Sequence, residues 1–287
     1  MYRIKFFFSF IFLYAIFSIS YASSLNGDAL FREEKYFEAA IEYERLIFRS
    51  ENVNDINSLK YKKALCYKKM NQFDRAIDEL QSLYFSNPGD SLYLSVCCEQ
   101  SLCYYLVGEP ARALWKIDEY LHRSNDSTSL NYFAPLKILC LNKLQRWQEA
   151  EDVFLQYVAI QNFSNERKIA YTQIVTSFYD KNYRPRMKSE QRAENLSRFI
   201  PGTGQAYAGE FGEGVVNLLM NASVLAFSGY QVYNGFYITG YLAGLGFFNK
   251  TYHGGIRRAG ILASKKNKEQ TIDFNLRIID FIQSDFE

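Results

Sequence analysis

The sequence contains few residues of the types that catalyse reactions or bind metal ions. It has two histidines, His122 and His253, and five cysteines. A zinc site or a histidine-based triad needs several such side chains to converge. His253 precedes Gly254 and Gly255, but no nucleophile or carboxylate partner accompanies it. We therefore expect no catalytic residue, no metal site and no cofactor, and we expect that the protein is not an enzyme.

Glycine-rich segments are the second pattern with possible chemistry. G-x-G occupies residues 202–204, and G-x-x-G-x-G occupies residues 209–214. A phosphate-binding loop has the form G-x-x-x-x-G-K-[ST] and follows a strand. Neither segment has that spacing, and no strand is predicted before either of them. The sequence therefore does not predict a nucleotide site.

Composition and charge exclude several further classes. Of the 287 residues, 48% are hydrophobic and 22% are charged, which excludes a disordered chain, a collagen and a small disulfide scaffold. The net charge of +2 is supplied by Arg3 and Lys5, because the rest of the chain carries 31 basic and 31 acidic residues. Nucleic-acid binding through bulk charge is therefore not expected. The mean hydropathy of -0.23 argues against a polytopic transporter.

A repeat of 37 residues covers the first half of the chain. Alanines that follow an aromatic residue or a proline by three positions recur at this interval: Ala39, Ala76, Ala113 and Ala150. Two further sets keep the same register: Leu30, Tyr67, Tyr104 and Leu141, and Leu46, Leu83, Tyr120 and Tyr157. Repeats with a period of 20 to 50 residues are typical of solenoids.

Each unit predicts two helices. Apolar residues recur at helical spacing over residues 61–70 and 73–84, and Pro88 follows the second helix. The pattern Ala64-x-x-Tyr67, Phe73-x-x-Ala76 and Leu80-x-x-Leu83 resembles the tetratricopeptide repeat (TPR) family, although the family period is 34. The resemblance implies an all-α fold. It also implies an α-solenoid of about four TPR-type helix-turn-helix units over residues 23–160. A helix over residues 166–179 is expected to close the solenoid, so that the domain covers residues 23–180.

The cysteines fit this interpretation. Cys66, Cys103 and Cys140 are also 37 residues apart. Packed helices lie about 10 Å apart, which is too far for equivalent cysteines to form a disulfide or to share a metal. Cys97 and Cys98 are adjacent and are the pair open to oxidation. We expect five free thiols, most of them buried.

The TPR resemblance also implies a concave face that binds a protein or peptide. By its register, the candidate groove residues lie on the first helix of each unit. They are Tyr61, Leu65, Lys68, Lys69, Leu102, Tyr105, Leu106, Leu139, Asn142 and Lys143, with Cys98 beside them. An apolar floor with lysines at its ends suits a peptide that carries a carboxylate. The alternative is that these lysines are solvated and that the apolar residues pack between units.

The N-terminus predicts export. Arg3 and Lys5 precede an apolar run over residues 6–19, and Ser20 and Ala22 place small residues two apart. This layout is typical of a secretory signal peptide over residues 1–22. An uncleaved anchor helix is the alternative, because the run is rich in phenylalanine.

Basic residues and then glycines mark a second module. We expect a basic linker helix over residues 181–200, since residues 181–287 carry 13 basic and 9 acidic groups against 18 and 22 over residues 23–180. A basic surface favours anionic lipid. Thirteen of the sixteen glycines lie between Gly202 and Gly260, and residues 214–249 carry no formal charge.

This module, over residues 201–262, resembles a bacterial membrane-hairpin domain of unknown function whose hallmark is P-G-x-G-Q-x-Y-x-G. The matching residues are Pro201, Gly202, Gly204, Gln205, Tyr207 and Gly209. Asn234-Gly235 predicts a turn between two apolar arms, and Gly240 and Gly244 form a G-x-x-x-G pair that lets helices touch in lipid. An amphipathic helix is expected over residues 263–287, with Ile272, Leu276, Ile279 and Ile282 on its apolar stripe.

Two alternatives stay open for the hairpin. A full span needs about 20 apolar residues, and the two arms offer 20 and 14. A shallow or re-entrant hairpin is therefore as compatible with the sequence as a double crossing. Basic flanks favour the cytoplasm, whereas the signal peptide would export them.

These features together predict a non-enzymatic adaptor that is exported and associated with a membrane of a bacterial cell envelope, with a periplasmic solenoid. Its expected partners are a protein or peptide on the concave face and membrane lipid at the hairpin and its basic flanks, with no nucleic acid. The alternative is a membrane-assembly or transport component in which the hairpin is the working part and the repeats recruit partners.

Overall fold

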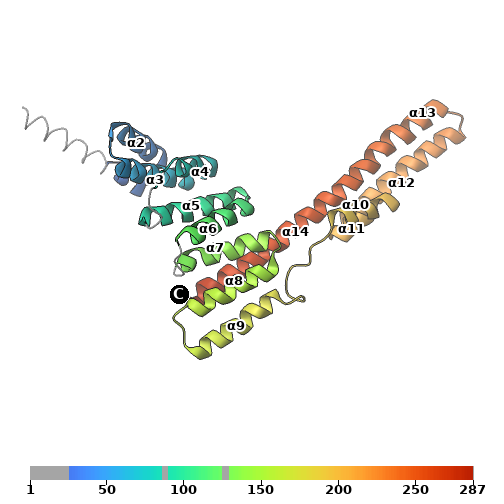
Figure 1. The fold of residues 1–287 in the computed structure, drawn as a ribbon. Helices are drawn as coiled ribbons and strands as arrows, with labels where there is room; N and C mark the ends of the chain where they lie inside the picture. Colours follow the sequence, from blue (N-terminus) through green and yellow to red (C-terminus); the bar gives the residue numbers. More distant parts are fainter. Residues whose placement is uncertain (1–25, 86–89, 125–128, 287) are drawn as a thin grey trace, which may run out of the picture. The chain divides into compact units, whose positions relative to one another are not determined.

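The computed structural model describes residues 26–85, 90–124 and 129–286 (Figure 1). The expected signal peptide at 1–22 and Pro88 lie outside these residues. Within them the structure is helical and contains no strand, so the all-α prediction is confirmed. The chain divides into two compact units, and the boundary between them falls between Thr176 and Ser177.

The first unit is a series of helices in which each packs against the next along the chain as far as α8 (Figure 1). Residues 26–32 are helical and precede these elements. The helices are α2 (Tyr36–Arg49), α3 (Val53–Lys69), α4 (Phe73–Gln81), α5 (Ser91–Val107), α6 (Pro110–Ser124), α7 (Leu130–Lys143), α8 (Trp147–Ile160) and α9 (Asn165–Tyr179). The last three residues of α9 belong to the second unit.

The turns before every second helix share one geometry. Helices α2, α4, α6 and α8 begin at Tyr36, Phe73, Pro110 and Trp147, which are 37 residues apart. The residue in the left-handed region of each preceding turn is Glu34, Asn71, Gly108 or Gln145, again 37 apart. Each turn also closes with the same backbone hydrogen bond, for example from the Gln72 amide to the Tyr67 carbonyl at 2.9 Å. One local structure is therefore built four times.

Ala113→Leu should destabilise the first unit, because Ala113 is completely buried where α5 and α6 pack together. Three added heavy atoms overpack such a crossing and cost about 1–3 kcal/mol. Ala111, two residues earlier, is exposed, so Ala111→Leu is the matched control. Thermal unfolding should show a lower melting temperature for the first variant alone. Equal melting temperatures would contradict this packing.

All five cysteines are free, and Cys98 is the one that is not fully buried, as expected. Burial raises the pKa of Cys140 to about 12 and that of Cys97 to about 11. The thiolate is the reactive form, and an exposed thiol ionises near pH 8.5.

Iodoacetamide at pH 9 should therefore modify the native protein slowly and all five thiols of the unfolded protein quickly, which mass spectrometry can count. The folded state keeps these protons at a pH where the unfolded chain releases them. The stability that the thiols contribute should accordingly fall as the pH rises above about 9. Rapid modification of the native protein would contradict the burial.

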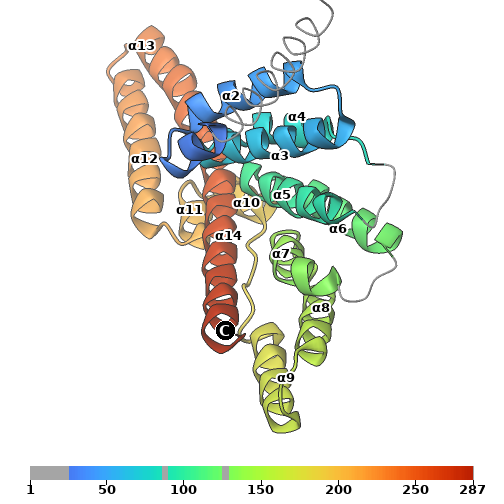
Figure 2. The ribbon, with the colours of Figure 1, turned by 90° about the vertical axis from the view of Figure 1, so that its left-hand side faces the viewer.

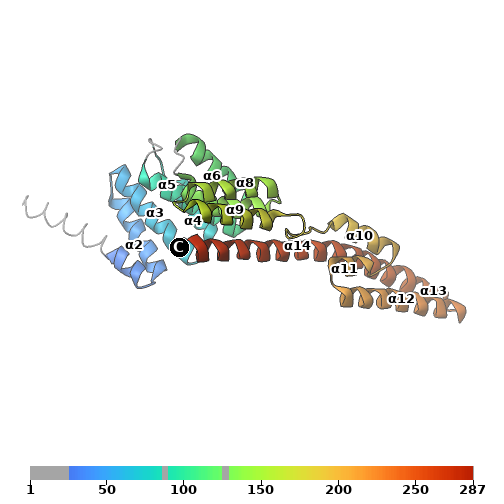
Figure 3. The same ribbon diagram turned by 90° about the horizontal axis from the view of Figure 1, so that it is seen from below.

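The second unit consists of a short helical corner and a long hairpin (Figure 2). Its elements are α10 (Glu190–Phe199), α11 (Thr203–Ala208), α12 (Phe211–Tyr233), α13 (Tyr237–Tyr241), a π-helix (Leu242–Phe247) and α14 (Phe248–Phe286). Helices α10 and α11 both pack on α14, as Figure 3 shows from below, and α12 packs against α13, the π-helix and α14.

Two expected elements differ from the structure. The basic linker is helical only from Glu190, because Pro185 lacks an amide hydrogen and restricts the residue before it. The expected boundary at residue 262 falls inside the uninterrupted helix α14.

The expected apolar stripe of the C-terminal helix is also wrong. Ile272 and Leu276 are exposed, and the buried positions are Thr271, Phe274, Asn275 and Ile278. Both sets have helical spacing. The ring of Phe274 packs 5.6 Å from that of Tyr179, and the ring of Phe281 lies equally far from that of Phe178, which selects the second stripe.

Candidate functional site

The candidate groove residues lie on three neighbouring helices. Helix α3 carries Tyr61, Leu65, Lys68 and Lys69, helix α5 carries Leu102, Tyr105 and Leu106, and helix α7 carries Leu139, Asn142 and Lys143. Helix α5 contacts both α3 and α7. The most accessible of the ten are Lys69 and Leu106, whereas Asn142 is completely buried and is not part of an accessible face.

Two of the three lysines bind neighbouring helices. The ammonium of Lys68 on α3 donates a hydrogen bond to the carboxylate of Glu99 on α5. The ammonium of Lys143 on α7 lies 3.7 Å from the centroid of the Tyr105 ring on α5 and donates to the Tyr105 carbonyl at 3.3 Å. These two lysines are therefore not solvated cations at the ends of a groove; each holds two neighbouring helices together. Lys69 is the exposed cation of the set.

Burial also governs the aromatic end of this face. It raises the pKa of Tyr61 above its ordinary value, and the nearby carboxylate of Glu99 acts in the same direction. The face thus offers apolar side chains and a neutral phenol, with Leu106 as an exposed apolar position near its middle.

The glycines of the hairpin motif lie where backbones meet. Gly202 has a φ of +96°, and a Cβ atom there would lie 2.1 Å from the carbonyl oxygen of Gly214 on α12. A Cβ atom on Gly204 would lie 2.0 Å from the carbonyl oxygen of Ala193 on α10. Any side chain at either position would push helices apart. Gly209 has a φ of +105° and ends α11.

Gln205 ties three helices together. Its side chain is 1% exposed on α11. Its amide nitrogen donates to the carbonyl of Gly255 on α14 at 2.9 Å, and its amide oxygen accepts from the hydroxyl of Ser197 on α10 at 3.0 Å. The Ser197 oxygen in turn accepts from the amide of Gly204 at 3.1 Å. Because a buried amide without partners is costly, this network fixes the position of α11.

Tyr207 anchors the segment before α10, and Pro201 lies in the turn after it. Pro201 occupies the turn that leads into α11, and the Tyr207 hydroxyl accepts from the amide of Ser189 at 3.2 Å. The Lys188 ammonium lies 5.0 Å from the centroid of the Tyr207 ring. Asn267 on α14 completes the joint, because its side chain pairs with both the amide and the carbonyl of Lys188, at 2.7 and 2.8 Å.

The two arms of the hairpin touch through small and polar residues. The Ser228 hydroxyl on α12 donates to the carbonyl of Gly240 at 2.6 Å, and a Cβ atom on Gly244 would lie 2.5 Å from the Ser228 oxygen. Nearer the base, the hydroxyl of Thr251 donates to the Asn221 side chain at 2.9 Å. Gly240 and Gly244 therefore do lie at the close approach of the arms. Ala222 and Ala226, two small residues four positions apart on the first arm, are exposed.

The outer surface of the hairpin is apolar. Among the described residues, α12 is the one helix long and apolar enough to cross a membrane by length and composition, and little of it is buried. Many large hydrophobic side chains of the two arms are exposed. They are Phe211, Val215, Val216, Leu218, Leu219, Met220, Leu225, Phe227, Tyr230, Val232, Tyr233, Phe236, Tyr237, Ile238, Tyr241, Leu242 and Phe247.

Charged groups mark the base of the hairpin. Arg258 on α14 forms a bidentate ion pair with Glu213 on α12, at 2.7 and 2.9 Å. Beyond this pair the first arm carries no formal charge. On the second arm, residues 236–249 are uncharged, and Lys250 is the first charged residue after the tip. The hairpin thus has a charged base, an uncharged tip and one cation, Lys250, part of the way along its second arm, next to the Thr251 that bonds to Asn221.

Sequence reasoning missed several residues that hold this site together. Ser197, Asn221, Asn267 and the Glu213–Arg258 pair were not singled out for these contacts. Their signal is weak, since each is a common polar residue whose partner lies on another helix. Only the motif glycines and Gln205 stand out from the sequence itself.

A scan of the chain against models of known protein families and a search of curated proteins both found no match.

Proposed function

We propose that the protein is a non-enzymatic adaptor tethered to a membrane of a bacterial cell envelope. Residues 23–180 would form a TPR-type solenoid that binds a protein or peptide, and the hairpin of residues 201–262 would hold it at the bilayer. The observation that carries the proposal is the uncharged and exposed surface of the hairpin above its charged base.

The apolar surface is the main support for the membrane contact. Exposed apolar patches of more than a few hundred Å² are rare on soluble proteins and mark contact surfaces. Here both arms expose large apolar residues up to the tip, where Tyr233 is 89% and Ile238 is 79% exposed. Lipid is the partner that can cover a hairpin on all its outer sides.

Dimensions and end residues agree with this partner. Residues 214–233 form about 30 Å of uncharged helix, the thickness of a bilayer core. Phe211 lies at the base, and Tyr233 and Tyr237 lie at the tip. Aromatic side chains favour the two membrane–water interfaces. The second arm is shorter, because Lys250 follows 14 uncharged residues, about 21 Å of helix, so a double crossing and a re-entrant hairpin both stay open.

The recurring turns support the solenoid part of the proposal. Helix starts, left-handed turn residues and buried alanines all recur at 37 residues. A stack of such units presents the first helices of neighbouring units side by side, which is the arrangement that TPR proteins use to bind peptides. The groove residues on α3, α5 and α7 lie on such helices.

Site-specific photo-crosslinking in cells tests the adaptor function. A photo-reactive amino acid at Leu106, exposed on α5, should crosslink to a partner protein that mass spectrometry identifies. The same amino acid at Trp115, which is exposed on α6 outside the groove set, is the matched control and should capture less of that partner.

A third position distinguishes the alternative function. Phe227 is exposed on the first arm of the hairpin. Capture of a protein partner from Phe227 and none from Leu106 would contradict the adaptor. It would favour the hairpin as the working part of a membrane-assembly or transport component.

A further inference from the structure

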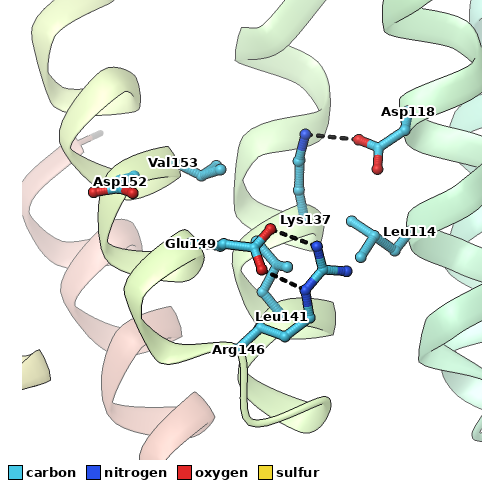
Figure 4. A pocket seen from close by; sticks show the side chains of 8 residues that line it. All are labelled: Leu114, Asp118, Lys137, Leu141, Arg146, Glu149, Asp152 and Val153. Carbon is cyan, nitrogen blue, oxygen red and sulfur yellow. Dashed lines mark hydrogen bonds and ion pairs between the residues drawn. The ribbon is translucent and has the colours of Figure 1, made fainter.

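A cavity of about 200 Å³ opens between α6, α7 and α8 (Figure 4). Leu114 and Leu141 supply apolar lining. Ion-paired side chains surround it, since Lys137 lies 2.7 Å from Asp118 and Arg146 pairs with Glu149 through both carboxylate oxygens. This cavity lies within the first unit, and none of its lining residues belongs to the groove set or to the hairpin.

The equivalent place 37 residues earlier is filled by a tyrosine ring. By the 37-residue register, Tyr104 is equivalent to Leu141, Gln81 to Asp118 and Arg112 to Glu149. The Tyr104 side chain is buried, and its hydroxyl accepts hydrogen bonds from Gln81 and from Arg112. The Arg112 guanidinium lies 4.4 Å from the centroid of the ring. Two of the residues that line the cavity, Asp118 and Glu149, are thus equivalent to the two that contact the Tyr104 ring and hydroxyl, Gln81 and Arg112.

One further interval back, an aromatic ring again occupies this position. Tyr67 stands there, with Lys63 at 5.7 Å and Arg75 at 5.9 Å from the centroid of its ring. The turn that follows is the same in all four units, closed by a hydrogen bond to the carbonyl of Leu30, Tyr67, Tyr104 or Leu141, and the first unit, like the fourth, carries a leucine here. Leu141 has no ring to fill the space, and the cavity lies at this position.

We propose that this cavity binds one tyrosine side chain of a partner protein. The ring would contact Leu114 and Leu141 as the Tyr104 ring contacts its own surroundings. The phenol hydroxyl would donate a hydrogen bond to the carboxylate of Asp118, which accepts where Gln81 donates.

Charge narrows the choice of partner segment. The cavity is lined by three carboxylates, Asp118, Glu149 and Asp152, and by two cations, Lys137 and Arg146. An excess of one negative charge favours a tyrosine next to basic residues. Phosphorylation of that tyrosine would place new negative charge beside the carboxylates and prevent binding.

L-Tyrosinamide, a phenol that carries a positive amine, is the probe. Ligand-observed NMR on the full chain in detergent should show saturable binding with a Kd of about 1 mM, as expected for a ligand of this size. O-phospho-L-tyrosinamide should bind at least about tenfold more weakly, because of the repulsion just described.

Two variants locate the binding. Leu141→Tyr fills the cavity with the ring that the second and third units carry and should weaken binding at least about tenfold, whereas Ile41→Tyr, at an exposed isoleucine of α2 outside the groove and the cavity, should leave it unchanged. Tyr104→Leu should open an equivalent cavity one unit earlier and add a second site for the probe.

The proposal is overturned if the native chain shows no saturable binding at about 10 mM probe, tenfold above the expected Kd. It is also overturned if Leu141→Tyr binds as well as the native chain. Circular dichroism verifies that each variant is folded. Should Leu141→Tyr fail to fold, an unchanged number of sites in folded Tyr104→Leu decides against the proposal.

Discussion

Leu242→Arg is expected to release most of the protein from membranes. Leu242 is 62% exposed on the second arm, where the proposal places it in hydrocarbon. An arginine near the centre of a membrane helix costs about 2.5–3.5 kcal/mol on insertion scales. Because 1.4 kcal/mol is tenfold in an equilibrium constant, the membrane partition should fall about a hundredfold. Flotation of the protein with liposomes on a density gradient measures the change.

The same substitution further along the chain is the control. Leu276 is 51% exposed on α14, outside the hairpin, so Leu276→Arg should float with the liposomes like the native protein. Circular dichroism should show full helix content for both variants. Equal flotation of the two variants would mean that Leu242 does not contact lipid.

Gly204→Ala should disrupt the corner formed by α10, α11 and α14. The added methyl group would lie 2.0 Å from the Ala193 carbonyl oxygen, 2.4 Å from the Ser197 hydroxyl and 2.8 Å from the Ala259 side chain. Backbone must move to relieve the first contact, which breaks the hydrogen bonds of Gln205. We expect a cost of about 3 kcal/mol, at the upper end for overpacking.

Hydrogen exchange followed by mass spectrometry reports on this corner separately from the rest of the chain. Peptides from residues 190–208 should lose protection in Gly204→Ala. Gly254 on α14 has open space around its Cβ position, so Gly254→Ala should keep or raise protection, since alanine favours a helix over glycine by about 0.5–1 kcal/mol. Unchanged exchange in both variants would contradict the close approach at Gly204.

Local pattern predicted the helices of the first unit well, because their signals lie within a few residues. The alanines, the turn residues such as Asn71 and Gly108, and the apolar spacing are all short-range features. What the sequence does not contain is the partner on another helix. From the sequence, Lys68 is compatible with a solvated cation. In the structure it donates a hydrogen bond to Glu99, which is 31 residues later in the chain.

In the second unit, too, the local signals are visible in the sequence and the partners on other helices are not. Gly204 and Gln205 stand out in the sequence, but their partners Ala193, Ser197 and Gly255 do not, and Gly255 is 50 residues away from Gln205. Basic charge over residues 181–200 gives no information on backbone conformation, and the segment before Glu190, which contains Pro185, is not helical. The C-terminal helix offered two stripes of equal spacing, and only the contact of Phe274 with Tyr179 selects between them.

Extraction of the native protein from membranes with high salt tests the central claim, that the hairpin is inserted in a bilayer, most directly. At about 1 M salt the Debye length falls to about 3 Å, so attachment through basic side chains is screened, whereas apolar burial is not. The account predicts that the protein stays in the membrane pellet and dissolves only in detergent. Complete release by salt alone would contradict an inserted hairpin and leave a protein held at the surface by charges such as Lys181 and Arg198.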